Sequence, residues 1–566
     1  MSEPSATFPF FRSERVLVRA LWAVALIPVA YILTHALLVS RNVAYWDELD
    51  TALLLLVRLD SDLSWSQLLA NLFALGNEHR TFTSRLLFAT SYWTTGTINF
   101  AVIGAIGNLF ICALCGLLIY TAGTTVRRVR LGVLLAFLIF QLEHYENFQW
   151  AGSSIDHFQV VLLAGVSVIG LSRGTRGGFL TGMLFALLAT FTLAHGLVAW
   201  AVGALMLGVE RRWSRFNFWL LAGAATAAVF FFGFSFNPGH NISVLSGSGL
   251  KHVLHYWLSL LGAPLALGQD AAEPFLGIAL LALLGRALSQ GAFSRERIAV
   301  PLALWAIGAL ALVAIGRADV TQGHIYSRYY ILGALAWALV LFLQFEERHD
   351  AAHPYRLLVR VLPVLGLFNI LANSEFGHDA RSWVICRDNA TEYFQRFGRD
   401  GMGRFTLHPN PEYASRLLRE VEQAGLYRMP RTCKQRWFPD AQVTTELSYY
   451  VDRINIDDQI MSMEGWVALP GSTSTPSQIH VILQSKQSHH IFTTIPQERA
   501  DVGIAFPGEK WLHSGFRFQR RRWLLPAEDF QIGLLLYSAG RAEFVMTAHR
   551  LDLRGKGVGI LANGSK

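Results

Sequence analysis

The stretch that decides the fold is VLVRALWAVALIPVAYILTHALLV, from Val16 to Val39, and Asp47 and Glu48 follow it closely. It is apolar over a length that can cross a bilayer, which takes about 20 helical residues. It is also too long for a cleavable signal peptide and lacks a small-residue cleavage site, so we expect it to remain as a span. Arginines before it place the N-terminus in the cytoplasm by the positive-inside rule: Arg12, Arg15 and Arg19.

The composition places the whole chain in the same class. Of its 566 residues 52% are hydrophobic and 16% charged, and the mean hydropathy is +0.35. These values indicate a polytopic membrane protein whose apolar excess fills residues 16–373. The net charge of +8 does not require a nucleic-acid partner, because most arginines of the first half lie in short clusters between apolar segments.

The apolar segments predict about eleven spans with a cytoplasmic N-terminus and a C-terminal region on the opposite side of the inner (plasma) membrane. Three further amphipathic segments, residues 51–59, 65–75 and 252–261, are expected as helices on the membrane surface. The predicted spans are about 16–39, 100–122, 131–142, 158–171, 179–207 as two short spans, 216–236, 274–288, 298–315, 330–345 and 357–371.

The polar remainder of the chain is expected outside the membrane. Residues 1–373 then form the transmembrane domain, 374–439 a helical linker region, and 440–566 a domain of short alternating strands that suggests a β-sandwich. Cys112 and Cys115 lie within a span and are read as packing residues. Cys386 and Cys433 fall in the outer region, where an oxidising compartment permits a disulfide, although spacing alone does not show that the two thiols meet.

Four polar clusters come from different loops, and the topology brings them to one face of the membrane. Carboxylates there can act as a general base or bind a divalent cation, whereas arginine and tyrosine side chains suit a phosphate. The convergence predicts a site at the lipid boundary. The clusters are Asp47-Glu48, Glu78-His79-Arg80, Glu143-His144-Tyr145-Glu146, and Arg317 with Arg328-Tyr329-Tyr330.

Each cluster has a structural alternative. Glu78 and Arg80 can simply pair with each other, and residues 143–146 can be the solvated end of a span. Arg317 can be an interfacial anchor, and His195 beside Gly196 is more often a turn histidine than a ligand.

An Asp-Glu pair just after the first span, amphipathic helices in that loop, many spans and an outer C-terminal domain resemble the GT-C superfamily of integral membrane glycosyltransferases. The resemblance covers the architecture of about residues 10–373. It implies transfer of a sugar from a polyprenyl phosphate to a surface glycan or glycoconjugate. Asp47 would deprotonate the acceptor or polarise it through a metal ion, with Glu48 in reserve, and metal dependence stays open. The tail residues Gly465-Trp466, Arg499-Ala-Asp501-Val502 and Ser514-Gly515-Phe516 are similar to β-sandwich domains appended to bacterial surface-glycan transferases.

The same resemblance implies roles for the remaining candidate residues. Arg328, Tyr329, Arg317 and Arg80 would hold the donor phosphate, and Glu78, His79, Glu143, His144 and Glu146 would line the site. A transporter or flippase for lipid-linked sugars is the alternative, although it needs a polar path at mid-span depth. A surface assembly protein merely anchored by its spans would need far fewer of them. The sequence identifies neither the sugar nor the acceptor.

Overall fold

The computed structural model forms two compact units that are described separately. Unit 1 comprises residues 1–380 and 421–428, and unit 2 comprises residues 381–420 and 429–566. The structure describes residues 14–61, 63–76, 79–234, 247–318, 321, 324–347, 353–397, 400, 407–430, 442–443, 447–456, 460–470, 478–485, 489–506, 511–521, 528–538 and 541–553.

Unit 1 is helical, and six of its described helices are long and apolar enough to cross a membrane. They indicate a membrane-associated protein, as the composition predicts. The six are Glu14–Val39 (α1), Phe100–Thr121 (α5), Ala151–Ser172 (α8, η3 and α9), Ala299–Arg317 (α16), Ser327–Glu347 (η6 and α17) and Arg356–Gly377, the first part of α18.

The other predicted spans also lie on helices, but these do not reach the same length and hydropathy. They are α6 (Thr125–Ile139), α10 (Arg176–Thr190), α11 (Val198–Val209), α12 (Trp213–Phe231) and α14 (Glu273–Ser289). Within the described part of the chain, the structure therefore establishes six candidate membrane helices and leaves the larger count as a prediction.

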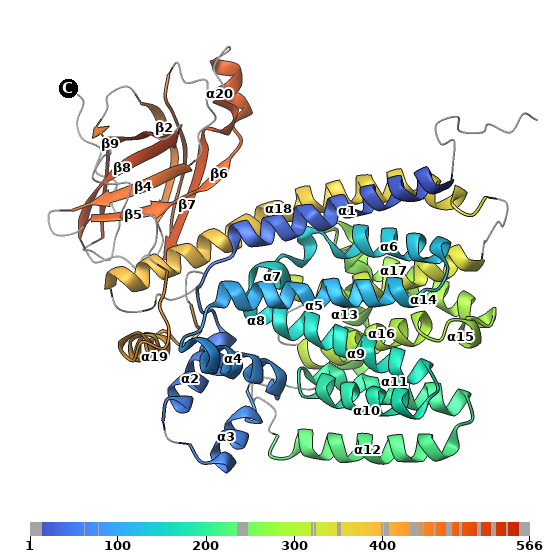
Figure 1. Ribbon diagram of the computed structural model, residues 1–566. Coiled ribbons are helices and arrows are strands. Elements are labelled where there is room, and N and C mark those ends of the chain that lie inside the picture. The colour runs from blue at the N-terminus through green and yellow to red at the C-terminus, as the bar shows by residue number, and fades with distance from the viewer. Residues whose placement is uncertain are drawn as a thin grey trace, which may run out of the picture. The chain divides into compact units, whose positions relative to one another are not determined.

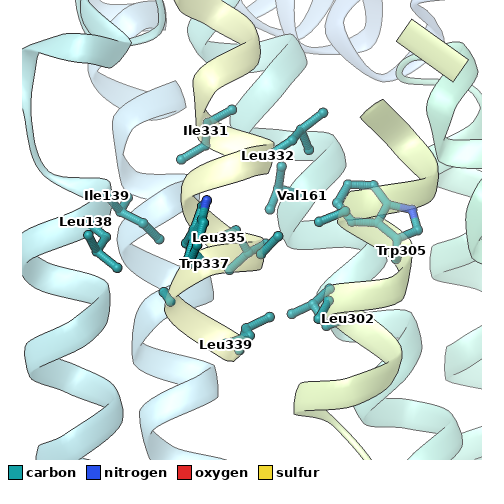
Figure 2. Packing of buried hydrophobic residues seen from close by; sticks show 14 of the residues in the cluster. Leu138, Ile139, Val161, Leu302, Trp305, Ile331, Leu332, Leu335, Trp337 and Leu339 are labelled. Carbon is teal, nitrogen blue, oxygen red and sulfur yellow. The ribbon is translucent and has the colours of Figure 1, made fainter. Parts of the chain in front are cut away.

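The core of unit 1 is built around α17 (Tyr330–Glu347), which is buried along nearly its whole length. Figure 2 shows Leu335 and neighbouring side chains of α17 between Ile139 of α6 and Leu302 and Trp305 of α16. In Figure 1 the helices around α17 run side by side, and α17 packs mainly against α16, α6 and α13. The bundle therefore offers two polar ends, where the turns between helices lie.

The segment expected to hold surface helices contains α2 (Leu54–Leu59), α3 (Trp65–Leu72) and α4 (Phe82–Thr95). Residues 252–261 differ from the prediction. They belong to α13 (Gly247–Ala266), whose side chains Tyr256, Leu260 and Leu261 are part of the main core. Because α13 packs against α14, α16 and α17, its apolar spacing serves helix packing rather than a membrane surface.

Helix α18 runs without a break from Arg356 to Phe397, so the predicted boundary at residue 373 falls inside a helix. Asn369 donates from Nδ2 to the carbonyls of Phe137 (3.0 Å) and Phe140 (3.1 Å) and thereby caps the end of α6. The amphipathic pattern at residues 412–426 becomes α19 (Pro411–Gln423).

Unit 2 carries a β-sheet region in its C-terminal part. One sheet has the strand order β1-β9-β8-β4-β5 and the other β2-β3-β7-β6. A buried cluster shares residues of both sheets, among them Met461, Phe518, Val481 and Leu534. The strands are β1 (Gln442–Val443), β2 (Ser448–Ile456), β3 (Ile460–Ala468), β4 (Gln478–Gln484), β5 (His489–Thr493), β6 (Ile495–Gln497), β7 (Gly515–Arg521), β8 (Asp529–Ser538) and β9 (Arg541–Asp552), with the short helix α20 (Ala500–Ala505) before β7.

The structure describes one of the two cysteine pairs considered in the sequence analysis. Cys115 is buried in α5 and Cys112 is half-buried there, and both are free thiols. The predicted pair is different: Cys433 and the side chain of Cys386 lie outside the described residues.

Candidate functional site

At one end of the bundle, which we call the turn end, the regular helices give way to short π-helices and 3-10 helices. These turns are η1 (Leu49–Leu53), η2 (Leu142–His144), η3 (Ser154–Phe158), η4 (Ala194–Leu197) and η6 (Ser327–Tyr329). Single π-turns inside helices are frequently found at functional sites, because they re-aim side chains. The short helix α7 (Tyr145–Gln149) lies among them.

The loop before η1 is fixed at both sides of Asp47. The hydroxyl of the buried Tyr427 donates to the Asn42 carbonyl (2.8 Å) and accepts from the Ala44 N–H (3.1 Å). Trp46 has a φ of +49°, a left-handed conformation that is rare for a bulky residue. Asp47 itself is exposed. Its carboxylate is therefore presented at the surface by a loop that is held rigidly on either side.

Glu48 has a different environment from its neighbour, because its side chain is 1% exposed. Oε2 accepts from the Tyr45 N–H (2.8 Å) and Oε1 from the Gly152 N–H (2.5 Å). A Cβ at position 152 would lie 3.0 Å from Cγ of Glu48, which explains the glycine. These contacts join the loop to α8 (Ala151–Ser153) through Glu48, and Asp47 is the exposed acid of the pair.

Arg328 is placed by a set of contacts between η6 and α7. Its Nη1 lies 3.4 Å from Oε1 of Glu146, and its backbone N–H donates to Oε2 of Glu146 at 3.0 Å. Asn147 donates to the Arg328 carbonyl (2.9 Å). These hydrogen bonds hold the backbone N–H and the carbonyl of Arg328, so the side chain starts from a fixed position.

Aromatic rings surround the same guanidinium. Cζ of Arg328 lies 4.3 Å from the ring centre of Tyr326, 5.4 Å from that of Tyr329 and 5.7 Å from that of Trp150. Cation–π contacts of this kind stabilise a partly buried charge while leaving its N–H groups available. Tyr329 and Glu146 thus lie beside Arg328, as predicted for the site.

His79 meets two histidines that the sequence analysis did not combine with it. The ring of His157 in η3 lies 6.2 Å from that of His195 in η4 and 5.6 Å from that of Tyr329. The N–H of Ala194 donates to Nδ1 of His79 (3.4 Å). Loss of hydration on burial is the largest cause that lowers the pKa of His79 to about 3, and the positive charge of Arg317 is the second. This imidazole is therefore neutral near pH 7.

Asp156 is a residue that sequence reasoning missed. It lies in η3, its Oδ1 accepts from the hydroxyl of Ser84, and both Asp47 and Arg85 act on it electrostatically. The signal was an Asp-His pair at the start of an apolar helix, since ionisable groups in such helices mark functional sites. The expected span began at Phe158 and so placed this pair in a loop.

Arg80, one of the remaining candidates, makes contacts that suit a structural role. Arg80 donates from Nε to the Phe230 carbonyl (2.9 Å), from Nη1 to the Phe73 carbonyl (2.7 Å), and from Nη2 to the Phe232 carbonyl. The guanidinium thus ties the loop to the end of α12 instead of facing a ligand. Glu78, its expected neighbour in the site, lies outside the described residues.

Glu143 and His144 are both fully buried in η2. Oε2 of Glu143 accepts from Nε2 of Gln141 (2.8 Å), and a ring nitrogen of His144 lies 3.3 Å from the Leu138 carbonyl. Burial raises the pKa of Glu143 well above its usual range and lowers that of His144 to about 4. Burial thus disfavours the charged form of both groups, which differs from the solvated span end considered as the alternative.

A divalent cation would need several carboxylate or imidazole ligands at one point. Among the described residues, no group of three or more His, Cys, Asp and Glu side chains is arranged to hold a metal ion. Both oxygens of Glu48 already accept backbone N–H groups, and a metal role for Asp47 and Glu48 stays open.

No protein-family model, curated protein or solved structure matches the chain. The functional argument therefore rests on the turn end itself. It brings together Asp47, Asp156, Glu146, Arg328 and Tyr329, with the three histidines and Arg317 beside them.

Proposed function

We propose that the chain is a membrane glycosyltransferase of GT-C type that moves a sugar from a polyprenyl phosphate to a glycan or glycoconjugate. In this proposal it has about eleven spans, a cytoplasmic N-terminus and a C-terminal β-sandwich on the outer side. The observation that carries the proposal is the exposed carboxylate of Asp47 within electrostatic range of Arg328, at the end of a bundle of apolar helices. Such a pair combines a base with a phosphate ligand.

The chemistry follows from these two groups. The acceptor hydroxyl oxygen attacks the anomeric carbon of the sugar, the bond from that carbon to the phosphate oxygen breaks, and Asp47 takes the hydroxyl proton. The departing polyprenyl phosphate keeps the electron pair, and the guanidinium of Arg328 stabilises the charge. Tyr326 and Trp150 hold Arg328 in place through their rings, which limits its reorganisation during the reaction.

The direct test uses purified protein in nanodiscs with a panel of synthetic polyprenyl-phosphate sugars. We expect release of polyprenyl phosphate from at least one donor, accompanied by a new glycosidic bond on an added glycan. A protein that binds donors but neither transfers nor hydrolyses the sugar would contradict the proposal.

A transporter or flippase of lipid-linked sugars is the second candidate. It is favoured by one observation, the polar pair Asp156 and His157 on the apolar helix from Ala151 to Ser172, because polar groups within a span can mark a substrate path. Proteoliposomes separate the two: movement of a labelled donor between leaflets without loss of its sugar would support transport.

The proposed orientation is tested with a membrane-impermeant thiol reagent on intact cells after mild reduction. Cys386 and Cys433 should react, while Cys112 and Cys115 in α5 should not. Protection of both tail thiols, with a control outer cysteine labelled, would contradict an outer C-terminal region.

A further inference from the structure

Three histidines from separate segments converge beside the arginines of the turn end. His79 exchanges two backbone hydrogen bonds with Gly76, His157 lies in η3, and His195 lies in η4. The rings of His157 and His195 are stacked with centres 6.2 Å apart, and His79 is close enough to interact electrostatically with both. We call these three residues the histidine cluster.

Two members of the cluster have an unused ring nitrogen in a buried position. Among the residues that the structure describes, Nδ1 of His157 and Nε2 of His195 have no hydrogen-bond partner, although these residues are only 7% and 4% exposed. A buried polar atom without a partner is unfavourable and needs an explanation, such as a ligand that completes it. The cluster thus holds two separate polar atoms whose partners are missing at the same place.

The charges around the cluster indicate the sign of the missing partner. The charged groups that act on His79 and His157 are Arg317 and Arg328, and their other neighbours are the imidazoles themselves. Glu146 pairs with Arg328 from its own side. A cation placed at the histidines would be repelled by both guanidinium groups, whereas an anion would be attracted.

The N–H groups of the neutral imidazoles can donate hydrogen bonds to an anion. His79 accepts the Ala194 N–H at Nδ1, so its proton is on Nε2 in the neutral form. A neutral imidazole always carries one N–H donor. The N–H can point to an oxygen of a ligand without the cost of burying another charge.

We propose that the histidine cluster, with Arg317 and Arg328, binds the phosphate group of the lipid-linked substrate, with His157 and His195 donating to its oxygens. This inference rests on the proposed function, because it names the residues that hold the donor phosphate. Phosphate oxygens suit the site because they accept several N–H donors at once and carry the charge that two arginines require.

A structural stack is the competing explanation. The ring of His195 lies 6.2 Å from that of Trp305, so the imidazoles also fill space in the core. Substitutions that keep the ring and remove the N–H separate the two explanations, because a stack needs only the ring whereas a ligand needs the donor.

The experiment measures binding of polyprenyl phosphate and of inorganic pyrophosphate to full-length protein in nanodiscs. The test variants are His157→Phe and His195→Phe. The rescue variants are His157→Asn, which restores an amide near Nδ1, and His195→Gln, which restores one near Nε2. His480→Phe is the matched control, a histidine buried to the same degree on β4.

We expect each test variant to weaken binding of polyprenyl phosphate on the order of 10- to 100-fold, the range for a hydrogen bond to a charged group. The rescue variants should recover much of this loss, and the control should bind normally. Pyrophosphate bound with the same variant pattern assigns the site to the phosphate group itself. If pyrophosphate does not bind, the lipid chain is also required for binding. The same differences among the variants are then still expected with polyprenyl phosphate.

Normal binding in folded Phe variants, or loss in the rescue variants equal to that in the Phe variants, would overturn the histidine assignment. In either case the wild type still binds and transfers, so the proposed function stands. If instead the wild type binds no phosphate compound and transfers no sugar, both proposals fail. A melting curve of each variant shows that it is folded.

Discussion

The two polar ends of the helical unit use their charges differently. At the end opposite the turns, which we call the ion-pair end, Arg127 forms two hydrogen bonds to Glu296 (2.6 and 2.9 Å), and Arg130 meets Glu346 at 2.9 Å. At the turn end, Arg328 lies 3.4 Å from Glu146, and the neighbouring His157 and His195 retain unpartnered ring nitrogens. Both ends contain buried polar atoms without a partner among the described residues, for example Nε of Arg128 at the ion-pair end, so the two ends differ in how close their ion pairs are.

The difference suggests that stability and chemistry are separated along the bundle. Close ion pairs join α5–α6 to the ends of α16 and α17, which fixes the packing of helices. Substitutions at the ion-pair end should therefore change stability before activity, and substitutions at the turn end should do the reverse. The following changes test that separation.

Asp47→Asn is expected to have the largest effect. It keeps the size and polarity of the side chain and removes the base, so turnover should fall at least about 10²-fold with little change in donor affinity. Asp156→Asn should reduce turnover less, because Asp156 acts on Asp47 electrostatically from η3. Turnover of a lipid-linked donor is the measurement, and near-normal turnover in Asp47→Asn would remove that residue from the catalytic role.

Arg130→Met tests the other end. The side chain of Arg130 is 3% exposed and donates to the carbonyls of Phe345 and Pro354 as well as to Glu346. Its loss should cost about 2 kcal/mol of stability, because buried acceptors lose their partner. The control is Arg286→Met, since Arg286 is 43% exposed and lies 3.7 Å from Glu347; it should cost about 0–1 kcal/mol. Equal thermal shifts for the two variants would contradict this account.

Arg328→Lys keeps the charge at the turn end and loses the planar fork. Donor affinity should fall about 10-fold, since lysine cannot hold two phosphate oxygens in the same way. Arg297→Lys provides the comparison at the ion-pair end, where Arg297 is 45% exposed and pairs with Glu210. Binding of polyprenyl phosphate should distinguish them, and unchanged affinity in a folded Arg328→Lys variant would count against a phosphate contact.

Glu143→Gln should have the smallest effect and a defined pH dependence. Burial raises the pKa of Glu143 above its ordinary 4.5, so the folded protein binds more protons than the unfolded chain. Stability should fall as the pH rises above about 4.5. The amide does not titrate, so the variant should gain stability relative to the wild type as the pH rises toward 7 and show no gain at pH 4. A gain of the same size at both pH values would show that the carboxyl group is not responsible.

Apolar length was the most informative feature of the sequence. The described residues of each predicted span lie mainly on helices, because a run of apolar side chains has no other stable use at that length. The predicted topology also placed Glu146 and Arg328 at the same end of the bundle, because alternate loops lie on the same side of the membrane. Spacing could not distinguish a surface helix from a packed one at residues 252–261, because both require an apolar stripe.

The site was predictable only in outline. Glu48 stood in reserve behind Asp47, and its contact with the backbone of Gly152, about a hundred residues away in sequence, could not be read from the sequence. The histidine cluster depends on two turns that interrupt helices, and such turns leave little signal in hydropathy. By contrast, Asp156 and His157 stood at the start of an apolar run, where an ionisable pair was a usable signal.

The left-handed backbone of Trp46 sets a limit on how this protein can be improved. That conformation costs free energy, of order 1–3 kcal/mol for a bulky residue, and a glycine there would recover part of it. Selection for heat resistance alone should therefore favour Trp46→Gly. The same change would remove the ring that stacks on Tyr45. The carboxylate of the neighbouring Asp47 would then be held less firmly in its orientation. Under the proposed function, a more heat-resistant variant of this kind would have a lower turnover, which is the usual direction of such exchanges.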